Sequence, residues 1–250
     1  MATVLSAPEK IHPSLWRGAQ LARARGTVVD TGYPSLSEQL PGGGWPVSAL
    51  IELLTQQPGV GEMRMLAPAL AAGKAPVAMI QPPADPVIAG LSYVGIPADR
   101  LLLLRAKTMS DQLWAAEQVL RAGTCSAVLL WHQHVHADWL RRLHLSARTG
   151  NALLFMVRPL TCAQDASPAE LRIAVRPDES GAAIRIIKRK GPTFEGELSI
   201  ELWPSAALGS QRSKARRPAR PATPQREAAV GRAAVIANAV AVDAVHLRSD

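Results

Sequence analysis

The stretch "ELLTQQPGVGEMRML" (Glu52 to Leu66) has the pattern of a strand, a glycine-containing turn and a helix. Turns of this kind bind phosphate groups in many proteins, because backbone amides at a helix N-terminus attract anions. A working phosphate loop also needs a lysine for the β- and γ-phosphates and a Ser or Thr hydroxyl for magnesium. If Gly61 is the last glycine of the loop, these positions hold Glu62 and Met63; without the one-residue gap, they hold Gly61 and Glu62. Neither alignment restores the chemistry.

We therefore interpret the turn as a degenerate phosphate loop that is structural and does not bind ATP usefully. A carboxylate that faces a triphosphate at short range in a partly buried site repels it strongly. The residues of this degenerate loop are Pro58, Gly59, Gly61 and Glu62. The prediction includes no catalytic residue, no cofactor and no bound metal.

On both sides of this stretch, apolar runs alternate with helix-like segments. Near-continuous apolar runs are typical of strands that are covered on both faces. Strict alternation of strands and helices predicts an α/β fold with a mostly parallel, doubly wound sheet. The clearest helix follows Thr108, which forms a capping-box pattern with Asp111, and it ends at Gly123. The expected strands are 26–30, 49–54, 75–80, 100–106, 126–131 and 152–157, and the expected helices are 61–73, 85–95, 109–123 and 137–150.

The sequence pattern changes twice in the C-terminal part of the chain. From Leu171, three runs separated by "DESG" and "GPTFE" predict an antiparallel extension of hairpins at one edge of the sheet. Beyond residue 204, Arg212 to Arg226 holds six basic residues, three prolines and no acid, which predicts a disordered basic linker. After the linker, an alanine-rich stretch is long enough for a helix that docks on the body or on a partner. We divide the chain into an N-terminal helix or arm (1–27), a core (28–204) and a tail (205–250).

Charge and composition restrict the partners and the compartment. A net charge of +8 favours polyanionic partners, although it identifies none. The tail cations predicted to contact DNA or a partner are Arg212, Lys214, Arg216, Arg217 and Arg220. The two cysteines, the absence of an apolar signal core at the start and the lack of a long apolar run predict a soluble protein of the cytoplasm, associated with the nucleoid.

Three segments resemble the recombinase ATPase RecA. Val28 to Leu53 is similar to the recombinase opening, with a threonine-glycine start, a leucine-centred helix and a triple glycine before the loop strand. Val94 to Trp131 resembles the stretch that ends in the Walker B strand, and Ile184 to Leu202 resembles the closing β-hairpin. The resemblance implies a RecA-like core from Val28 to Leu202.

The departures from RecA concern its catalytic positions. The Walker B aspartate should end the strand "SAVLLW", where Trp131 stands. The glutamate that activates water should follow "VAMI", where the sequence is "QPPADP" and Pro83 takes its place. Together with the missing loop lysine, these replacements indicate a pseudo-ATPase. The loops that contact DNA in RecA are short here, and the chain has few aromatic residues that could stack on bases. Both features argue against recombinase activity.

A compact RecA-like core without a nucleotide site and with a basic tail is similar to ImuA, the accessory family of bacterial translesion synthesis. In that family the pattern found here at Pro58 to Glu62 is a recurring form of the degenerate phosphate loop. The resemblance implies three partners: ImuB, an error-prone DNA polymerase III α-type subunit, and RecA. The alternative is the RecA-like cell division inhibitor SulA, whose members are shorter. A third interpretation, an active RecA-type ATPase, conflicts with the missing lysine.

Two further segments have a functional and a structural interpretation. In RecA-like filaments the hairpin lysines reach the neighbour's ATP, and the matching residues are Lys188 and Lys190, with Arg189 between them; alternatively these cations keep an edge strand from aggregating. The stretch from His12 to Gly26, around Trp16, can form a helix, which we expect to dock either on a neighbouring protomer, as the resemblance to RecA implies, or on its own sheet.

The sequence "WHQHVHAD" raises the question of a metal site. His132, His134 and His136 would share one face if the strand continued, with Asp138 nearby as a zinc-ligand set. If the strand instead ends at Trp131, the histidines are loop residues and Asp138 caps the next helix.

Overall fold

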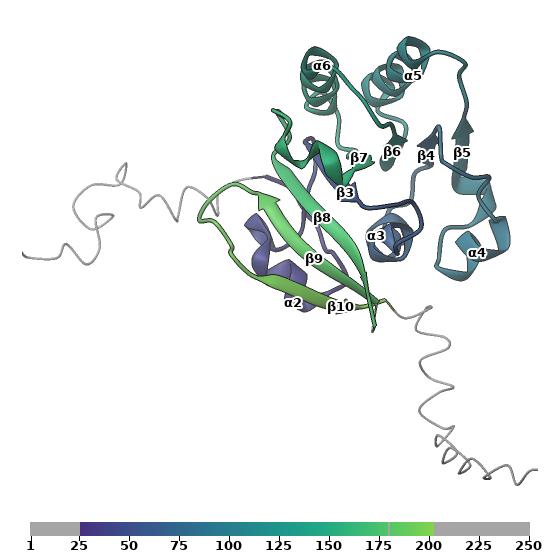
Figure 1. Cartoon of the computed structure of the whole chain (residues 1–250). Coiled ribbons are helices and arrows are strands. Elements are labelled where there is room, and N and C mark those ends of the chain that lie inside the picture. The colour runs from purple at the N-terminus through teal and green to yellow at the C-terminus, as the bar shows by residue number, and fades with distance from the viewer. Residues whose placement is uncertain (1–25, 180, 203–250) are drawn as a thin grey trace, which may run out of the picture. The chain divides into compact units, whose positions relative to one another are not determined.

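The computed structural model describes residues 26–179 and 181–202, which form an α/β unit around one eight-stranded sheet (Figure 1). The sheet order is β10-β9-β8-β3-β7-β6-β4-β5. Its strands are β3 (Leu50–Thr55), β4 (Val77–Ile80), β5 (Leu101–Leu104), β6 (Ala127–Trp131), β7 (Leu153–Pro159), β8 (Leu171–Asp178), β9 (Gly181–Lys188) and β10 (Glu197–Glu201). The helices are α2 (Pro34–Gln39), α3 (Glu62–Ala72), α4 (Ile88–Tyr93), α5 (Met109–Ala122) and α6 (Ala137–Ala147).

The sheet separates two hydrophobic layers, as the doubly wound prediction requires. Successive residues of β3 alternate between them, with Leu50 in one layer and Ile51 in the other. Helices α5 and α6 cover the Leu50 face, and α2 and α3 cover the Ile51 face (Figure 1). The central strands are therefore buried on both sides, which explains their continuous apolar runs.

The expected strands and helices form, and the predicted caps of α5 are confirmed. The hydroxyl of Thr108 accepts the backbone N–H of Asp111 at 3.2 Å, and Gly123 ends the helix with a φ of 64°. The opening segment folds as a small two-stranded sheet of β1 (Val28–Val29) and β2 (Trp45–Pro46). A side chain at Gly44 would meet the carbonyl oxygen of Val29 at 2.3 Å, so the last glycine of the triplet allows this close pairing.

Three expectations about strands are wrong. Strand β8 does not begin an antiparallel edge, because it pairs in parallel with β3 and only then antiparallel with β9. Strand β9 is not an edge strand either, since β10 pairs with it from Gly181 to Arg185. Strand β5 is at the edge and is not covered on both faces: Leu102 and Leu103 are about two-fifths exposed.

The predicted cap of α6 also differs from the structure. The N-cap is His136, and no side chain makes the capping hydrogen bond. Asp138 instead lies in the first turn, 3.8 Å from Arg141. At that position a carboxylate is still favourable, because it faces the positive end of the helix dipole.

Candidate functional site

The degenerate loop forms the tight turn between β3 and α3. Gly59 and Gly61 both have positive φ angles, 85° and 105°. Residues with a side chain adopt such angles only at a cost in free energy. Gly61 is also needed for packing, since a Cβ there would lie 2.4 Å from a methyl carbon of Leu202. The glycine spacing thus serves the turn and its contact with the end of the hairpin.

Glu62, at the position expected to hold the lysine, turns its carboxylate back into the loop. The residue is 3% exposed, and its Oε1 accepts the backbone N–H of Gly59 at 2.9 Å. Its Oε2 is buried without a hydrogen-bond partner among the described residues. The amide of Gly59 could otherwise bind an external anion, but it is already bonded to the carboxylate of Glu62, the first residue of α3.

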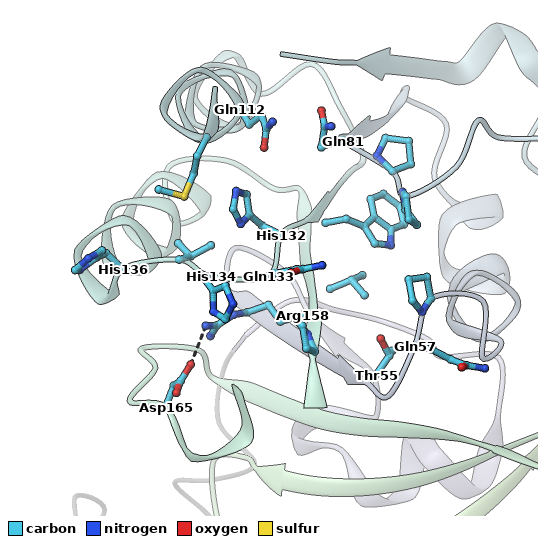
Figure 2. A pocket seen from close by; sticks show the side chains of 18 of the residues that line it. Thr55, Gln57, Gln81, Gln112, His132, Gln133, His134, His136, Arg158 and Asp165 are labelled. Atoms are coloured by element: carbon cyan, nitrogen blue, oxygen red, sulfur yellow. Dashed lines mark hydrogen bonds and ion pairs between the residues drawn. The ribbon is translucent and has the colours of Figure 1, made fainter. Parts of the chain in front are cut away.

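A cleft of about 1180 Å³ lies beside the loop, at the carboxyl ends of the parallel strands (Figure 2). Its residues come from the ends of β3, β4, β6 and β7 and from the starts of α5 and α6. Open α/β sheets bind ligands at this edge, because the loops after the strands diverge there. The cleft is therefore the candidate site.

Polar atoms without partners are concentrated in the residues that line this cleft. Among the described residues, six buried side-chain N or O atoms have no hydrogen-bond partner, and four of them belong to cleft residues. Each such atom costs about 1–3 kcal/mol when left unpaired. The four are Gln81 Oε1, Trp131 Nε1, His132 Nδ1 and Arg158 Nε.

The backbone of Gln81 is strained as well. Its φ is 53°, in the left-handed region that residues other than glycine rarely adopt. Gln81 directly follows β4, and its backbone N–H donates to the carbonyl of Leu104 at the end of β5. Strain of this kind occurs preferentially at ligand sites, where the surrounding structure holds it.

A network of buried ion pairs lies next to the cleft and includes one of its lining residues, Arg158. Arg158 Nη1 lies 3.1 Å from Glu52, and its Nη2 lies 3.0 Å from Asp165, the contact drawn in Figure 2. Arg172 Nε lies 2.5 Å from the other oxygen of Glu52. Glu52, Arg158 and Arg172 are all at least nine-tenths buried, so each charge depends on the others. Arg172 also donates to the carbonyls of Cys162, Ala163 and Asp165, which holds the loop after β7 against the sheet.

A signal for this network is present in the sequence, although the comparison of motifs missed it. Glu52 stands alone in the apolar run of β3, and Arg158 and Arg172 interrupt the runs of β7 and β8. A single charge inside a buried strand needs a partner of opposite sign. Because β3 lies between β7 and β8, these three residues meet.

The three histidines lie in the cleft but do not gather around one point. Figure 2 shows their side chains pointing in different directions. Among residues 26–179 and 181–202, no group of three or more His, Cys, Asp or Glu side chains could hold a metal. Burial lowers the pKa of His132, and the neighbouring His134 and Arg158 lower it further, which favours the neutral imidazole. The strand ends at Trp131, and the histidines are loop residues as the second interpretation predicted.

The predicted hairpin cations are held by the chain itself. Lys188 donates to the carbonyl of Ser167 at 2.9 Å, and Lys190 lies 2.7 Å from Glu170 while its side chain remains 64% exposed. Arg189 donates to the carbonyls of Gln39 and Pro192, and its guanidinium lies near the ring of Phe194. These contacts place the cations at the end of β9 away from the degenerate loop, which leaves their role a prediction.

The other predicted partner residues lie outside the described residues. These are Trp16 and the tail cations Arg212, Lys214, Arg216, Arg217 and Arg220. None of the helices in the described part is long and apolar enough to cross a membrane.

Comparison with known proteins finds relatives over part of the chain. The cell division inhibitor SulA of Photorhabdus laumondii is 33% identical over 78 residues, which are 31% of this chain and 44% of that protein. SulA of Edwardsiella piscicida is 32% identical over 69 residues (28% of this chain, 41% of that protein), and SulA of Yersinia pestis is 36% identical over 70 residues (28% and 42%). This chain resembles SulA. The matches span less than half the length of these relatives. No family model matches the chain.

Proposed function

We propose that this chain is a non-catalytic, RecA-like accessory protein of the SOS response to DNA damage, of the ImuA type. In this role it links ImuB and an error-prone polymerase III α-type subunit to RecA during translesion synthesis. The observation that carries the proposal is the carboxylate of Glu62 inside the degenerate loop, bonded to the amide of Gly59. A carboxylate held at this turn opposes a phosphate group, which supports a loop that serves as structure and does not bind ATP usefully.

The sheet supports the RecA-like part of this proposal. A mostly parallel sheet with an antiparallel end, helices on both faces and a loop after β3 is compatible with that fold. Trp131 ends β6 at the position expected for the Walker B aspartate, and it is 8% exposed. An indole buried there is consistent with a fold retained for binding.

A second candidate function is division inhibition like that of SulA, and the comparisons favour it. The aligned stretch is 31% of this chain but 44% of the Photorhabdus protein, so that relative is the shorter of the two. The additional length here, with its basic segment, is the feature that favours the ImuA type. Both candidates act by binding a partner without turnover.

One affinity purification separates the two candidates. The full-length chain, tagged and expressed in DNA-damaged cells, is recovered, and its partners are identified by mass spectrometry. Recovery of ImuB and the polymerase subunit supports the accessory role. Recovery of the tubulin-like division protein without ImuB supports the inhibitor role. ATP hydrolysis stimulated by single-stranded DNA would contradict both.

A further inference from the structure

The edge of the sheet at β5 is an uncovered apolar strand. Because β5 is the last strand in the sheet order, no strand among the described residues pairs with its outer side (Figure 1). The strand consists of four leucines, and Leu102 and Leu103 are 40% and 39% exposed. Proteins usually protect such an edge with a charge, a proline or a bulge, and β5 has none of these in its own residues. An apolar edge without this protection favours pairing with a further strand.

Exposed apolar side chains are concentrated next to this edge. Among the residues that the structure describes, nine large apolar side chains are exposed, and five of them lie between Val87 and Leu103. Three of the five belong to the connection from β4 to β5, which contains α4; they are Val87, Ile88 and Tyr93. Helix α4 itself has no buried residue. A concentration of this kind is typical of an interaction surface.

The backbone of Leu103 directs its hydrogen-bonding groups away from the sheet. The carbonyl of Leu104 accepts the N–H of Gln81 on the β4 side. Because the backbone groups of successive strand residues point to alternate sides, the N–H and C=O of Leu103 are on the outer side. The Leu103 side chain lies on the same face as Leu101, which packs against the layer that contains Ile51.

A second copy of the chain can pair with this edge by symmetry. Two identical strands that run antiparallel side by side are related by a two-fold axis perpendicular to the sheet, so one residue faces its own equivalent. With Leu103 at the axis, the N–H and C=O of each Leu103 bond to those of the other copy. Both Leu103 side chains then lie on the same face and contact each other.

Two exposed charges on either side of β5 favour this arrangement. Asp99 precedes the strand and Lys107 follows it, and neither has an ion pair within the described part of the chain. They lie beyond opposite ends of β5, so one copy does not bring them together. Asp99 and Lys107 are equally far from Leu103 in the sequence. Antiparallel pairing at Leu103 therefore places Asp99 of each copy opposite Lys107 of the other.

We propose that the chain forms a two-fold dimer in which the β5 strands of two copies pair antiparallel at Leu103. The two sheets become continuous across the axis, and the exposed side chains of the β4–β5 connection border the paired strands and enlarge the apolar contact. Because the paired strands are short, we expect a dissociation constant on the order of 10–100 µM. The inference goes beyond the proposed function and does not depend on it, since a dimer can serve either candidate.

The first test is sedimentation velocity of the full-length chain at concentrations from about 5 to about 500 µM, a range that brackets the expected constant. The variant Leu103→Lys places a cation at the axis opposite its own copy and should weaken the dimer at least about 10-fold. Leu103 is partly exposed, so the variant keeps the core intact. The control Leu145→Lys makes the same change on α6, where the side chain is 54% exposed, and should leave the dimer unchanged.

A charge exchange tests the orientation of the two strands. Asp99→Lys should weaken the dimer roughly 3- to 10-fold, because two attractive pairs become repulsive. Addition of Lys107→Asp to that variant should restore it, since the opposite charges are then only exchanged. The control Asp138→Lys makes the same change in net charge at an exposed residue of α6 and should have no effect.

A cross-link tests the register directly. Under mild oxidation, Leu103→Cys should form a covalent dimer, because hydrogen-bonded residues of antiparallel strands have Cα atoms about 5.5 Å apart, within the range of a disulfide. The native Cys125 and Cys162 are buried and should not contribute. The control Leu145→Cys should stay monomeric on a reducing-agent-free gel.

Three results would overturn the proposal. A chain that remains monomeric at about 500 µM would leave the edge to another occupant, such as a strand of a different protein. A dimer that Leu103→Lys does not weaken would have its contact elsewhere. Failure of both the charge exchange and the Leu103→Cys cross-link would exclude antiparallel pairing at Leu103. None of these results bears on whether ImuB is recovered from cells, so the two proposals fail separately.

Discussion

The Oε1 atom of Glu62 lies 2.9 Å from the backbone nitrogen of Gly59, so the degenerate loop is closed by its own carboxylate. A nucleotide phosphate at this turn would meet a buried negative charge and an amide that is already bonded. We expect calorimetric titration with magnesium-ATP to show no saturable heat up to millimolar nucleotide. Micromolar binding that disappears in Gly61→Ala would contradict this expectation.

The same contact predicts a stability effect for Glu62→Ala. Loss of the acceptor leaves the Gly59 amide unpaired, but it also removes the unpaired Oε2, so we expect a loss of about 1 kcal/mol in the free energy of unfolding. Hydrogen exchange at the Gly59 amide should become faster. The control Glu38→Ala removes an exposed carboxylate of α2 and should change stability by less than about 0.5 kcal/mol. Unchanged exchange at Gly59 would show that the bond does not form in solution.

The two glycines of the loop should differ in their tolerance of alanine. Both have positive φ angles, so each Gly→Ala change costs about 1–2 kcal/mol in backbone strain. Only Gly61→Ala also places its Cβ 2.4 Å from Leu202, whereas Gly59→Ala meets nothing within 4 Å. Urea unfolding should show Gly61→Ala to be the more destabilising by about 1–3 kcal/mol.

A double-mutant cycle isolates the Leu202 contact. In the Gly61→Ala background, Leu202→Ala removes the clashing methyl groups and should cost less than it does in the wild-type chain. Equal costs in both backgrounds would mean that the end of the hairpin does not pack on the loop.

The buried ion network predicts a larger effect. Glu52→Ala leaves Arg158 and Arg172 without their shared carboxylate, and removal of one partner from a buried network costs about 3–5 kcal/mol. The matched exposed pair is Asp138 and Arg141, so Asp138→Ala should cost less than about 1 kcal/mol. Denaturant unfolding of both variants checks the contrast. A loss under 1 kcal/mol for Glu52→Ala would mean that solvent reaches the network.

Most helices and strands were predicted from local signals, because these signals depend only on residues that are close in the sequence. The capping box of Thr108 and Asp111 and the closing glycine at residue 123 act within one helix and are readable from the sequence. The parallel pairing of β8 was not readable, since its alternating pattern fits a hairpin equally well and the neighbour that it takes, β3, lies more than a hundred residues earlier.

The cleft could not be predicted from the sequence for a related reason. Gln81 follows β4, Trp131 ends β6 and Arg158 lies in β7, so only the order of the strands in the sheet brings these residues to the lining of one cleft. No motif links a glutamine, a tryptophan and an arginine at these spacings. The burial of Glu62 was equally unreadable, because a glutamate at the first helical position is favourable even when it is fully solvated.

The proposed function requires a contact with RecA, and the hairpin cations are the residues expected to make it. Lys188 and Lys190 match the lysine pair that reaches a neighbour's ATP in RecA-like filaments, and here they bond to Ser167 and Glu170. The Lys190 side chain is 64% exposed, so its ion pair is weak enough to exchange for a stronger anion. Such a pair would let the protein occupy the ATP-bearing end of a RecA filament without adding a nucleotide site of its own.

Charge reversal tests this contact. The double variant Lys188→Glu with Lys190→Glu should abolish co-sedimentation with ATP-bound RecA filaments and leave ImuB binding nearly unchanged. The control variant Lys74→Glu with Lys107→Glu makes the same change in net charge at two exposed lysines elsewhere, so it separates a local contact from general electrostatic attraction. Equal loss in both double variants would indicate attraction by net charge alone. Full RecA binding by the hairpin variant would assign the contact to another segment, either the basic tail or the helix predicted around Trp16.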